Sequence, residues 1–593
     1  MAQTEIKVRW LDRDLFIDWG KEGRSTLVSM LFAKRGLRPD QVLRLGQLPN
    51  PLDARHPLPG MEQAKQQIVD AIKANRPITI VGDYDCDGAT STTVAMRALR
   101  MMGAKSVDFI IPSRFAHGYG ISPPVVQAIV DQHGEGPRTI LTVDNGISAF
   151  AGIEAAKAKG WSVVVTDHHL PADTRPQADA IVDPMVDEST YPGRYLAGVG
   201  VVFMLALSVR SQLLKDGFLK ERPKLEELLD LVAVGTVADM VRLDPVNLAL
   251  VDAGLKRIRS GQASAGIKAL IEVAGLKDKT DRLRAMDIGF SVAPRINAAG
   301  RMSDMAGGIA CLLSDDPKEA LSLAGSLDTI NRERRAVEGE MREQAVNLIQ
   351  ADEHASDSLT TCVMGEGWHE GVVGIVAGRL KDSLGKPAFV FARNDDGTLK
   401  GSGRSVEGLH LRDALDEVHK RIPEVLLRFG GHAAAAGCTI TPDGFDAFKE
   451  AFEDVALKHA DALSVQTVET DGAFPAMLWN CENIDDMNQQ IWGQGFAAST
   501  FVDDVQITHQ RDLRGGHKAG KLRTSEGLEA EFVMWKRTEP LPLDGRIIWS
   551  AEVNEWNGRR TPKITIQKLF NPLPSSDQLP VSEQASSASV QPE

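Results

Sequence analysis

A short apolar segment near residue 80 runs directly into three aspartates at alternate positions. Residues 78–81, ITIV, have the β-branched character of a buried strand, and Asp83, Asp85 and Asp87 follow at once. Carboxylates crowded in this way repel one another unless a cation lies among them. We expect a helix over residues 88–99, which places the acids at a strand-to-helix turn, where open α/β sheets bind their ligands. A solvated acidic turn is the alternative that this segment alone leaves open.

Length and composition set the outer limits of the prediction. With 593 residues, the chain is too long for one hydrophobic core, and three or four domains are expected. It holds no run of about 18 apolar residues and no leader-like segment, which predicts a cytoplasmic protein without a membrane contact. Its five cysteines are scattered without a CxxC pair, as is usual for reduced thiols and not for zinc ribbons. The net charge of −14 means that any contact with nucleic acid must come from local basic patches.

An alternation of short apolar runs and amphipathic helices follows a loose N-terminal arm, which we assign to residues 1–60. The alternation fills residues 61–315 and is typical of a buried, mostly parallel sheet. The expected strands are residues 78–81, 107–111, 139–143, 162–166 and 180–182.

Acidic and imidazole side chains follow several of these predicted elements. Asp144 comes directly after one strand, and His168 and His169 come after the next. Asp239 follows a predicted helix over residues 224–237. Because the carboxyl ends of parallel strands meet at one edge of a sheet, we expect these groups to converge with the first three aspartates. The sequence therefore predicts a metal site at this edge.

The types of ligand in this set indicate which metal it holds. Oxygen ligands dominate, with one or two imidazoles and no thiolate, which favours Mn²⁺ or Mg²⁺ over zinc or an iron–sulfur cluster. Five or more ligands exceed what one ion with open positions uses, so we expect two ions that share carboxylates. Two-metal sites of this kind catalyse hydrolytic displacement at phosphorus.

The motifs DYDCDG, VDNG, TDHH and VADMVRL resemble, in order and spacing, the four metal-site motifs of the DHH phosphoesterases. The resemblance continues through RINAAGRM, WHEGVVG and GGH and covers most of residues 60–440. It implies that Asp144 and Asp239 bridge the ions, that His169 faces the scissile phosphate, and that Asp83 supports the ligands from behind. The metal ligands that it implies are Asp85, Asp87, Asp144, His168 and Asp239, and the catalytic residues are His169, Asp144 and His168.

A long helix and a second α/β domain follow the metal-site motifs. Apolar residues at helical spacing over residues 317–351 predict a connecting helix within 316–355. Residues 356–464 are then the DHH-associated domain, with glycine-rich loops at 401–405 and 430–432 that suit an anion. Tyr119 is available for base stacking. The residues expected to bind substrate phosphates are Arg114, Asn297, Arg301, Ser402, Arg404, Gly431 and His432.

The pattern changes to five short alternating strands over residues 465–571, which is typical of an OB-like barrel. The expected strands are residues 501–507, 521–524, 528–535, 546–553 and 562–568. A track for single-stranded DNA is expected from the basic residues Arg511, Arg514, Lys518, Lys521 and Arg523. Trp535, Trp549 and Trp556 add aromatic surface, unless they are core residues beside a solvated loop. The polar residues 572–593 are expected to be disordered.

The expected fold is thus α/β, with a parallel-sheet DHH domain and a smaller DHH-associated domain joined by a long helix, followed by an OB-like barrel. The resemblance implies an exonuclease that degrades single-stranded DNA from its 5′ end to 5′-mononucleotides, in DNA repair and recombination. It also suggests a single-strand-binding protein and a helicase as partners. One rival function is a phosphodiesterase acting on short oligonucleotides or cyclic dinucleotides, against which the barrel counts. The other is a non-catalytic DNA-binding scaffold, against which the intact acids and histidines count.

Overall fold

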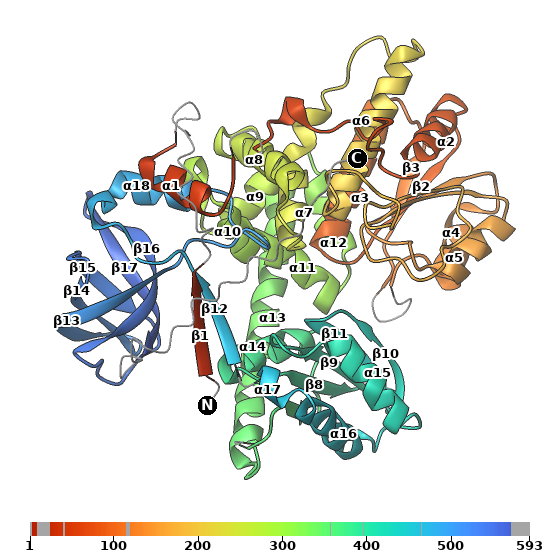
Figure 1. The fold of residues 1–593 in the computed structure, drawn as a ribbon. Coiled ribbons are helices and arrows are strands. Elements are labelled where there is room, and N and C mark those ends of the chain that lie inside the picture. The colour runs from red at the N-terminus through yellow and green to blue at the C-terminus, as the bar shows by residue number, and fades with distance from the viewer. Residues whose placement is uncertain are drawn as a thin grey trace, which may run out of the picture. The chain divides into compact units, whose positions relative to one another are not determined.

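Two compact units make up the chain (Figure 1). The computed structural model describes residues 3–8, 24–38, 42–113, 119–355, 357–394, 396–463 and 465–570. One unit comprises residues 1–5, 40–467 and 489–497, and the other comprises residues 6–39, 468–488 and 498–593. The predicted N-terminal arm is therefore divided between the two units. The predicted disordered tail, residues 572–593, lies outside the described residues.

A five-stranded parallel sheet forms the centre of the first unit, as predicted. Its strands, in spatial order, are β3 (Val107–Ile110), β2 (Ile78–Val81), β4 (Thr139–Val143), β5 (Ser162–Thr166) and β6 (Ala180–Val182). Every neighbouring pair is parallel, so all five strands end at the same edge. The chain runs from β2 to β3 and then returns to β4 on the other side of β2. The ends of β2 and β4 therefore flank the switch point at which such sheets bind ligands.

Helices pack around this sheet and extend its hydrophobic core. They are α2 (Met61–Lys73), α3 (Cys86–Met101), α4 (Pro123–His133), α5 (Phe150–Ala158), α6 (Gly198–Lys215), α7 (Leu229–Ala238), α8 (Pro245–Arg259) and α9 (Ala265–Val273). Helix α6 is long and apolar enough to cross a membrane, but 72% of it is buried inside the protein. That degree of burial is what the central helix of a globular core shows.

A continuous helical run of three elements precedes the helices that lead into the second domain. It consists of α10 (Ala285–Asp287), a π-helical turn η6 (Ile288–Val292) and α11 (Ala293–Met302). Helix α12 (Ala306–Leu313) and then the 35-residue helix α13 (Pro317–Ala351) follow. The connecting helix has the bounds that its apolar spacing predicts.

The second α/β domain has a mixed sheet covered by helices. In spatial order its strands are β10 (Leu426–Gly431), β11 (Ala435–Ile440), β9 (Leu399–Arg404), β8 (Ala388–Arg393) and β7 (Thr361–Met364). Its helices are α14 (Val373–Leu384), α15 (Leu411–Arg421), α16 (Phe445–Leu457) and α17 (Ala460–Leu463).

The two glycine-rich segments of this domain lie mostly in strands, so their prediction as loops is wrong. A Cβ atom on Gly401 would lie 2.3 Å from the ring of Phe391, and one on Gly403 would lie 2.4 Å from the ring of Phe389. These rings belong to the neighbouring strand β8 and are fully buried. Glycine is therefore required here because phenylalanine fills the space beside the strand, and not because the chain turns.

The second unit contains a closed five-stranded barrel with the strand order β13-β14-β15-β17-β16. The strands are β13 (Phe501–Leu513), β14 (His517–Thr524), β15 (Glu529–Met534), β16 (Asp544–Trp556) and β17 (Arg559–Phe570). Only β15 and β17 pair in parallel, which agrees with the predicted OB-like topology. Further elements of the chain are β1 (Gln3–Val8), α1 (Thr26–Lys34), β12 (Val465–Thr470) and α18 (Cys481–Gln489).

Trp549 is fully buried inside the barrel, so its prediction as surface is wrong, whereas Trp535 and Trp556 are exposed. The indole Nε1–H of Trp549 donates a hydrogen bond to the buried carboxylate of Asp503 over 2.8 Å. Phe474 and Phe501 pack against the same indole. Trp549 is therefore a core residue of the barrel.

Candidate metal centre and nucleic-acid site

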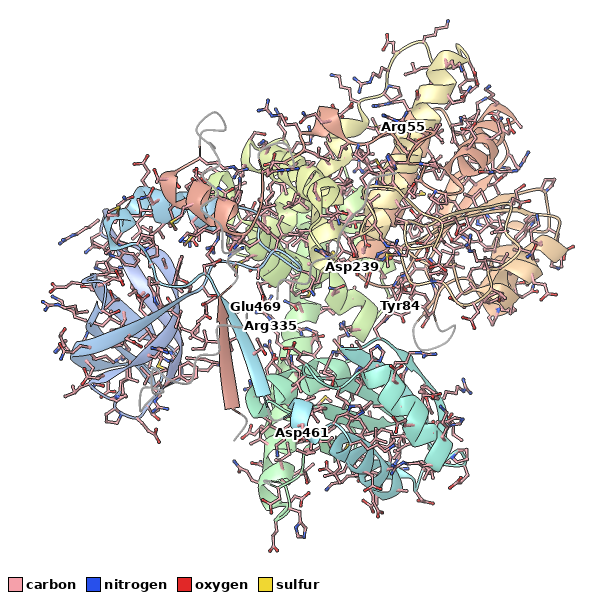
Figure 2. All side chains as sticks on the ribbon, viewed as in Figure 1. Arg55, Tyr84, Asp239, Arg335, Asp461 and Glu469 are labelled. Carbon is pink, nitrogen blue, oxygen red and sulfur yellow. The ribbon has the colours of Figure 1, made fainter. Side chains whose placement is uncertain are left out.

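Carboxylates and imidazoles from four segments of the first unit meet at the carboxyl edge of the parallel sheet. They form three groups in which the ligand atoms lie within 4.8 Å of one another. The groups are Asp83, Asp85 and Asp144; Asp87, His168 and Asp239; and Asp144, His168 and His169. Figure 2 labels Asp239 at the end of α7 and Tyr84 within the first acidic motif. Every carboxylate and imidazole that the sequence predicts for the metal site thus lies in this cluster.

Helix α3 begins earlier than predicted, at Cys86 instead of Gly88. The side chain of Asp85 caps the helix, because its Oδ1 accepts a hydrogen bond from the backbone N–H of Gly88 over 3.0 Å. Asp87 consequently lies inside the first helical turn, where the helix dipole favours a negative charge. The early start aims Asp87 into the protein interior, towards α6.

Asp87 is fully buried, and the first turn of α6 holds its carboxylate. Its Oδ2 accepts a hydrogen bond from the N–H of Gly198 over 2.7 Å, and its Oδ1 accepts one from Val199 over 3.0 Å. Burial, followed by the charges of Asp239 and Asp85, nevertheless raises the pKa of Asp87 well above its usual value. The two backbone hydrogen bonds do not offset the burial and the repulsion between carboxylates, whereas the positive charge of a bound cation would.

Asp144 lies between two of the metal groups and has a left-handed backbone with a φ of 62°. Its Oδ1 lies 3.0 Å from Nε2 of His168. Burial and then the neighbouring carboxylates raise the pKa of Asp144 well above its usual value. A non-glycine residue in this conformation costs about 1–3 kcal/mol and is characteristic of functional sites.

Two glycines allow helices to approach these acids closely. A Cβ atom on Gly198 would lie 2.7 Å from Cβ and 2.8 Å from Oδ1 of Asp144. A Cβ atom on Gly235 in α7 would lie 2.2 Å from Thr90 Oγ1 and 2.9 Å from Asp87 Oδ1. Sequence reasoning missed both glycines, because only the folded chain reveals which helix approaches which acid.

His168 has the protonation state of a metal ligand. Burial lowers the pKa of its imidazole, against the charge of Asp239, which raises it. Its Nε2 lies 3.6 Å from Asp239 Oδ2 and 3.8 Å from Asp87 Oδ2. A neutral imidazole at this position offers a nitrogen lone pair to a cation.

His169 differs from His168 in that its protonated form is stabilised, because its imidazole N–H is hydrogen-bonded to a buried carboxylate. Its Nδ1 lies 2.7 Å from Oδ1 of Asp167. The side chain of Asp167 is buried, and its other oxygen, Oδ2, accepts a hydrogen bond from the N–H of Ile147. Burial alone would lower the pKa of His169, but the hydrogen bond and charge of Asp167 raise it to about 9. The pair with Asp167 therefore favours the protonated form of His169. Sequence reasoning missed Asp167 as a site residue, although it stands inside the motif TDHH.

Tyr119 is tied to the site by its hydroxyl group. The hydroxyl donates to the backbone oxygen of Asp144 over 2.9 Å and lies 3.3 Å from Nδ1 of His169. The ring meets His169 and Tyr84 edge-on and is 48% exposed. One part of the ring thus remains open to solvent, and base stacking on it stays a prediction.

Arg404 and Ser402 lie together on β9 of the second domain. Nη1 of Arg404 donates to Ser402 Oγ over 3.2 Å and to the oxygen of Gly403 over 2.8 Å, and Nη2 lies close to Gly374 at the start of α14. Arg404 forms no ion pair with any described residue, and burial lowers the pKa of its guanidinium. A half-buried cation without an acidic partner suits an anion.

The remaining residues predicted to bind phosphate are divided among several positions. Asn297 accepts a hydrogen bond from the N–H of Cys86 over 2.8 Å, and Arg301 Nη1 donates to the oxygen of Gly371 over 3.3 Å. Gly431 is the last residue of β10. The pKa of His432 is lowered, first by burial and then by the positive charge of His169. Arg114 lies outside the described residues.

The basic track predicted on the barrel is only partly a surface. Lys518 is 6% exposed, and its Nζ lies 2.5 Å from Asp512 Oδ1 across the β13–β14 pair, so its assignment to an exposed track is wrong. Arg523 is exposed and pairs with Glu529. Arg511, Arg514 and Lys521 are exposed and form no ion pair with the residues that the structure describes.

The cluster fits two divalent cations of the hard, oxygen-preferring kind. Asp83, Asp85 and Asp144 can surround one ion, and Asp87, His168 and Asp239 can surround a second. No cysteine belongs to the groups, and the raised pKa values of Asp87 and Asp144 show the charge that cations would neutralise. Asp83 lies in the same ligand group as Asp85, so it can contact a cation directly, in contrast to the supporting role predicted for it.

Comparison with known families defines the class of protein first. The N-terminal domain model of the DHH family matches residues 77–236, and the DHHA1 domain model matches residues 356–458. The switch point of the sheet and all metal-group residues except Asp239 fall in the first match. The strand with Arg404 falls in the second. The fold and the site thus define a DHH protein with an associated DHHA1 domain.

Curated relatives narrow this class. The single-stranded-DNA-specific exonuclease RecJ of Dickeya dadantii is 40% identical over 562 residues, which cover 92% of this chain and 96% of the relative. RecJ of Escherichia coli is 39% identical over 563 residues, with the same coverage of both chains. This chain belongs to the RecJ family of single-stranded-DNA-specific exonucleases.

Solved structures agree with this assignment. The crystal structure of RecJ from Thermus thermophilus in complex with Mn²⁺ matches with a TM-score of 0.79 and 28% identity, over 96% of this chain and 80% of that chain. The complex of the same protein with Mg²⁺ matches with a TM-score of 0.74 and 27% identity, over 96% of this chain and 79% of that one. The predicted overall architecture is therefore confirmed.

Proposed function

We propose that this protein is a two-metal exonuclease that degrades single-stranded DNA from the 5′ end and releases 5′-mononucleotides. The observation that carries the proposal is the pair of ligand groups on one sheet edge, with Asp144 in one group and His168 in the other, only 3.0 Å apart. The family of the chain supports the substrate, since its relatives carry the name single-stranded-DNA-specific exonuclease. The RecJ structures with Mn²⁺ and Mg²⁺ support the choice of cation.

The metal ligands divide into two sets that meet at Asp144. Asp83, Asp85 and Asp144 would hold one cation, and Asp87, His168 and Asp239 the other, with Asp144 and Asp239 as candidate bridges. When bound, two such cations supply a nucleophilic water at neutral pH and stabilise the charge that develops on the scissile phosphate. The first turn of α6 fixes Asp87 by two hydrogen bonds, so that the ligand set is oriented before any substrate arrives.

His169 binds the scissile phosphate as a cation. Asp167 accepts a hydrogen bond from its Nδ1, which leaves Nε2–H as the donor towards a phosphate oxygen. The hydrogen bond and negative charge of Asp167 favour a positive charge on the ring. Burial of Asp167 keeps water from competing for the same imidazole proton.

Arg404 reads the 5′ end in this proposal. Its planar guanidinium lacks an ion pair among the described residues and lies beside the first turn of α14, where backbone N–H groups add to its charge. Ser402, which accepts a hydrogen bond from Arg404, would share a terminal phosphate with Gly431 and His432 at the end of β10. Asn297 and Arg301 would hold phosphates nearer to the metal groups, Arg114 would hold the terminal phosphate together with Arg404, and Tyr119 would stack a base.

The barrel would bind the strand beyond the cleavage site. Arg511, Arg514, Lys521 and Arg523 supply the exposed cations for this contact. We assign the protein to the cytoplasm and to DNA repair and recombination, with a single-strand-binding protein and a helicase as partners.

The test is cleavage of one single-stranded oligonucleotide labelled at either end, in the presence of Mn²⁺. A 5′ label should appear at once as a mononucleotide, whereas a 3′ label should shorten in single steps. Arg404→Ala should raise the KM and remove the preference for a 5′-phosphate over a 5′-hydroxyl, while Arg393→Ala, an exposed arginine of the same sheet, should not. Immediate release of the 3′ label would contradict the proposed polarity.

A further inference from the structure

One face of the helical run over residues 285–302 stays open to solvent along its whole length. Exposed or half-buried positions recur on it at helical spacing, and most of the residues between them are buried. Asn297 and Arg301, two of the proposed phosphate-binding residues, occupy its C-terminal part. The positions of this face are Met286, Phe290, Pro294, Asn297 and Arg301.

The other end of this face carries large apolar side chains. Phe290 is 72% exposed and Met286 is 41% exposed, while Ile288 and Val292 on either side of Phe290 are fully buried. A phenyl ring in water forgoes the stabilisation that burial would give. Exposure of this degree on an otherwise well-packed helical run indicates a contact surface when further apolar side chains join it.

The outward position of Phe290 has a local cause. Pro294 has no backbone N–H, and its ring would clash with the carbonyl group four residues earlier, which is that of Phe290. The chain relieves this clash by the π-helical turn η6, which contains Phe290. The sequence therefore specifies the turn that presents the phenyl ring.

Met240 extends the apolar surface towards the metal groups. It directly follows Asp239, has a left-handed backbone with a φ of 61° and is 70% exposed. The π-helical turn packs on the last turn of α7, since a Cβ atom on Gly289 would lie 3.4 Å from Val237 Cγ1. The turn that contains Phe290 thus packs on the end of α7, and Met240 follows the metal-group carboxylate of Asp239 at that same end.

We propose that Phe290, with Met240 and Met286, forms a base platform on which unpaired nucleobases stack as the strand approaches the metal groups. The proposal rests on the proposed function. The occupant is single-stranded DNA because the platform is continuous with Asn297 and Arg301 and adjoins Asp239, so phosphates and bases meet complementary groups along one helix face. Bases inside a duplex are stacked on one another and cannot each lie on an aromatic ring, so the platform favours single strands over duplex DNA.

The test is a double-mutant cycle. It compares the KM of the wild type and of Phe290→Ala on intact single-stranded DNA and on substrates that carry one abasic site, which is moved one position at a time. Phe290→Ala should raise the KM about tenfold and leave kcat nearly unchanged, because stacking contributes to binding and not to the chemical step. An abasic site at one position should raise the wild-type KM by a similar factor and have little further effect on the variant. Phe290→Trp should retain the wild-type KM, and Phe290→Leu should fall between the two.

Phe218→Ala is the matched control, because Phe218 is also an exposed phenylalanine of this unit but lies beyond the end of α6. Its KM should equal that of the wild type. An unchanged KM for Phe290→Ala, or full additivity with abasic sites at every position, overturns the platform. It would leave this surface as a site for another protein. A wild-type enzyme that cleaves no single-stranded DNA would instead overturn the proposed function.

Discussion

At the scale of single residues, backbone geometry holds the carboxylates of the metal groups as much as side-chain chemistry does. Asp144 has a left-handed backbone, and Asp87 is fixed by the N–H groups of Gly198 and Val199. The acid motifs predict which carboxylates converge, because parallel strands bring their ends together. They do not predict the conformation of Asp144 or the approach of α6, because both depend on packing between distant segments.

Gly198 therefore has a specific role, and Gly198→Ala should weaken Mn²⁺ binding about tenfold or more. The added methyl group would lie within 3 Å of the Asp144 side chain and would push this shared carboxylate out of position. Isothermal titration calorimetry with Mn²⁺ measures the change in affinity. Gly200→Ala is the control, because its methyl group would meet only the flexible side chain of Leu196. Equal affinities for the two variants would contradict the role of Gly198.

At the scale of elements, the sequence predicts the parallel sheet, the connecting helix and the barrel, because apolar periodicity determines them directly. The errors occur where a residue serves tertiary packing. Gly401 and Gly403 are strand residues that make room for phenylalanine rings, and Lys518 and Trp549 are buried with acidic partners. A single sequence does not reveal such partners, since they come from other strands.

Helix α1 is held within its unit by a buried ion pair that the sequence does not indicate. Arg35, which follows α1, contacts Asp471 through two nitrogen–oxygen pairs of 2.8 and 2.6 Å, and both side chains are almost fully buried. Asp471→Ala should lower the free energy of unfolding of this unit by about 3–5 kcal/mol, because it leaves a buried charge uncompensated.

Denaturant unfolding measures this change. Asp252→Ala is the control, since Asp252 forms an exposed pair with Lys256 on one helix face and should cost less than about 0.5 kcal/mol. A loss for Asp471→Ala as small as that of the control would show that the buried pair does not hold α1 in place.

The barrel should lose stability as the pH rises, because Asp503 is a buried acid. Burial raises its pKa to about 7 against the hydrogen bond from Trp549, which lowers it, whereas an unfolded aspartate titrates near 3.9. The group therefore stabilises the fold fully below pH about 4, and this contribution is lost as the pH rises to about 7.

Asp503→Asn should reduce this pH dependence and make the barrel more stable than wild type at pH 8. The amide oxygen still accepts the hydrogen bond of Trp549, and no charge is buried. Unfolding at several pH values, monitored by tryptophan fluorescence, measures the effect. Identical slopes for wild type and variant between pH 4 and 7 would show that Asp503 is not the titrating group.

At the scale of the whole molecule, a chain with a net charge of −14 has to bind a polyanion through local patches. We propose the exposed barrel cations Arg511, Arg514 and Lys521 as such a patch. Changing all three to alanine should reduce the slope of log K against log salt concentration by about 2 for single-stranded DNA, because fewer phosphates are neutralised. Arg175→Ala, which removes an exposed arginine paired with Glu188, should leave the slope unchanged. A triple variant with the wild-type slope would place the track elsewhere.

The central claim is that the carboxylate cluster around Asp144 is the metal centre that hydrolyses single-stranded DNA. The most direct test is the rate of mononucleotide release from single-stranded DNA in the presence of Mn²⁺, for wild type and Asp144→Ala at equal fractions of folded protein. We predict rapid release by the wild type and a loss of about a thousandfold or more in the variant, with DNA binding largely retained, because the shared ligand of the site is gone. Release by Asp144→Ala within about tenfold of the wild-type rate would contradict the account.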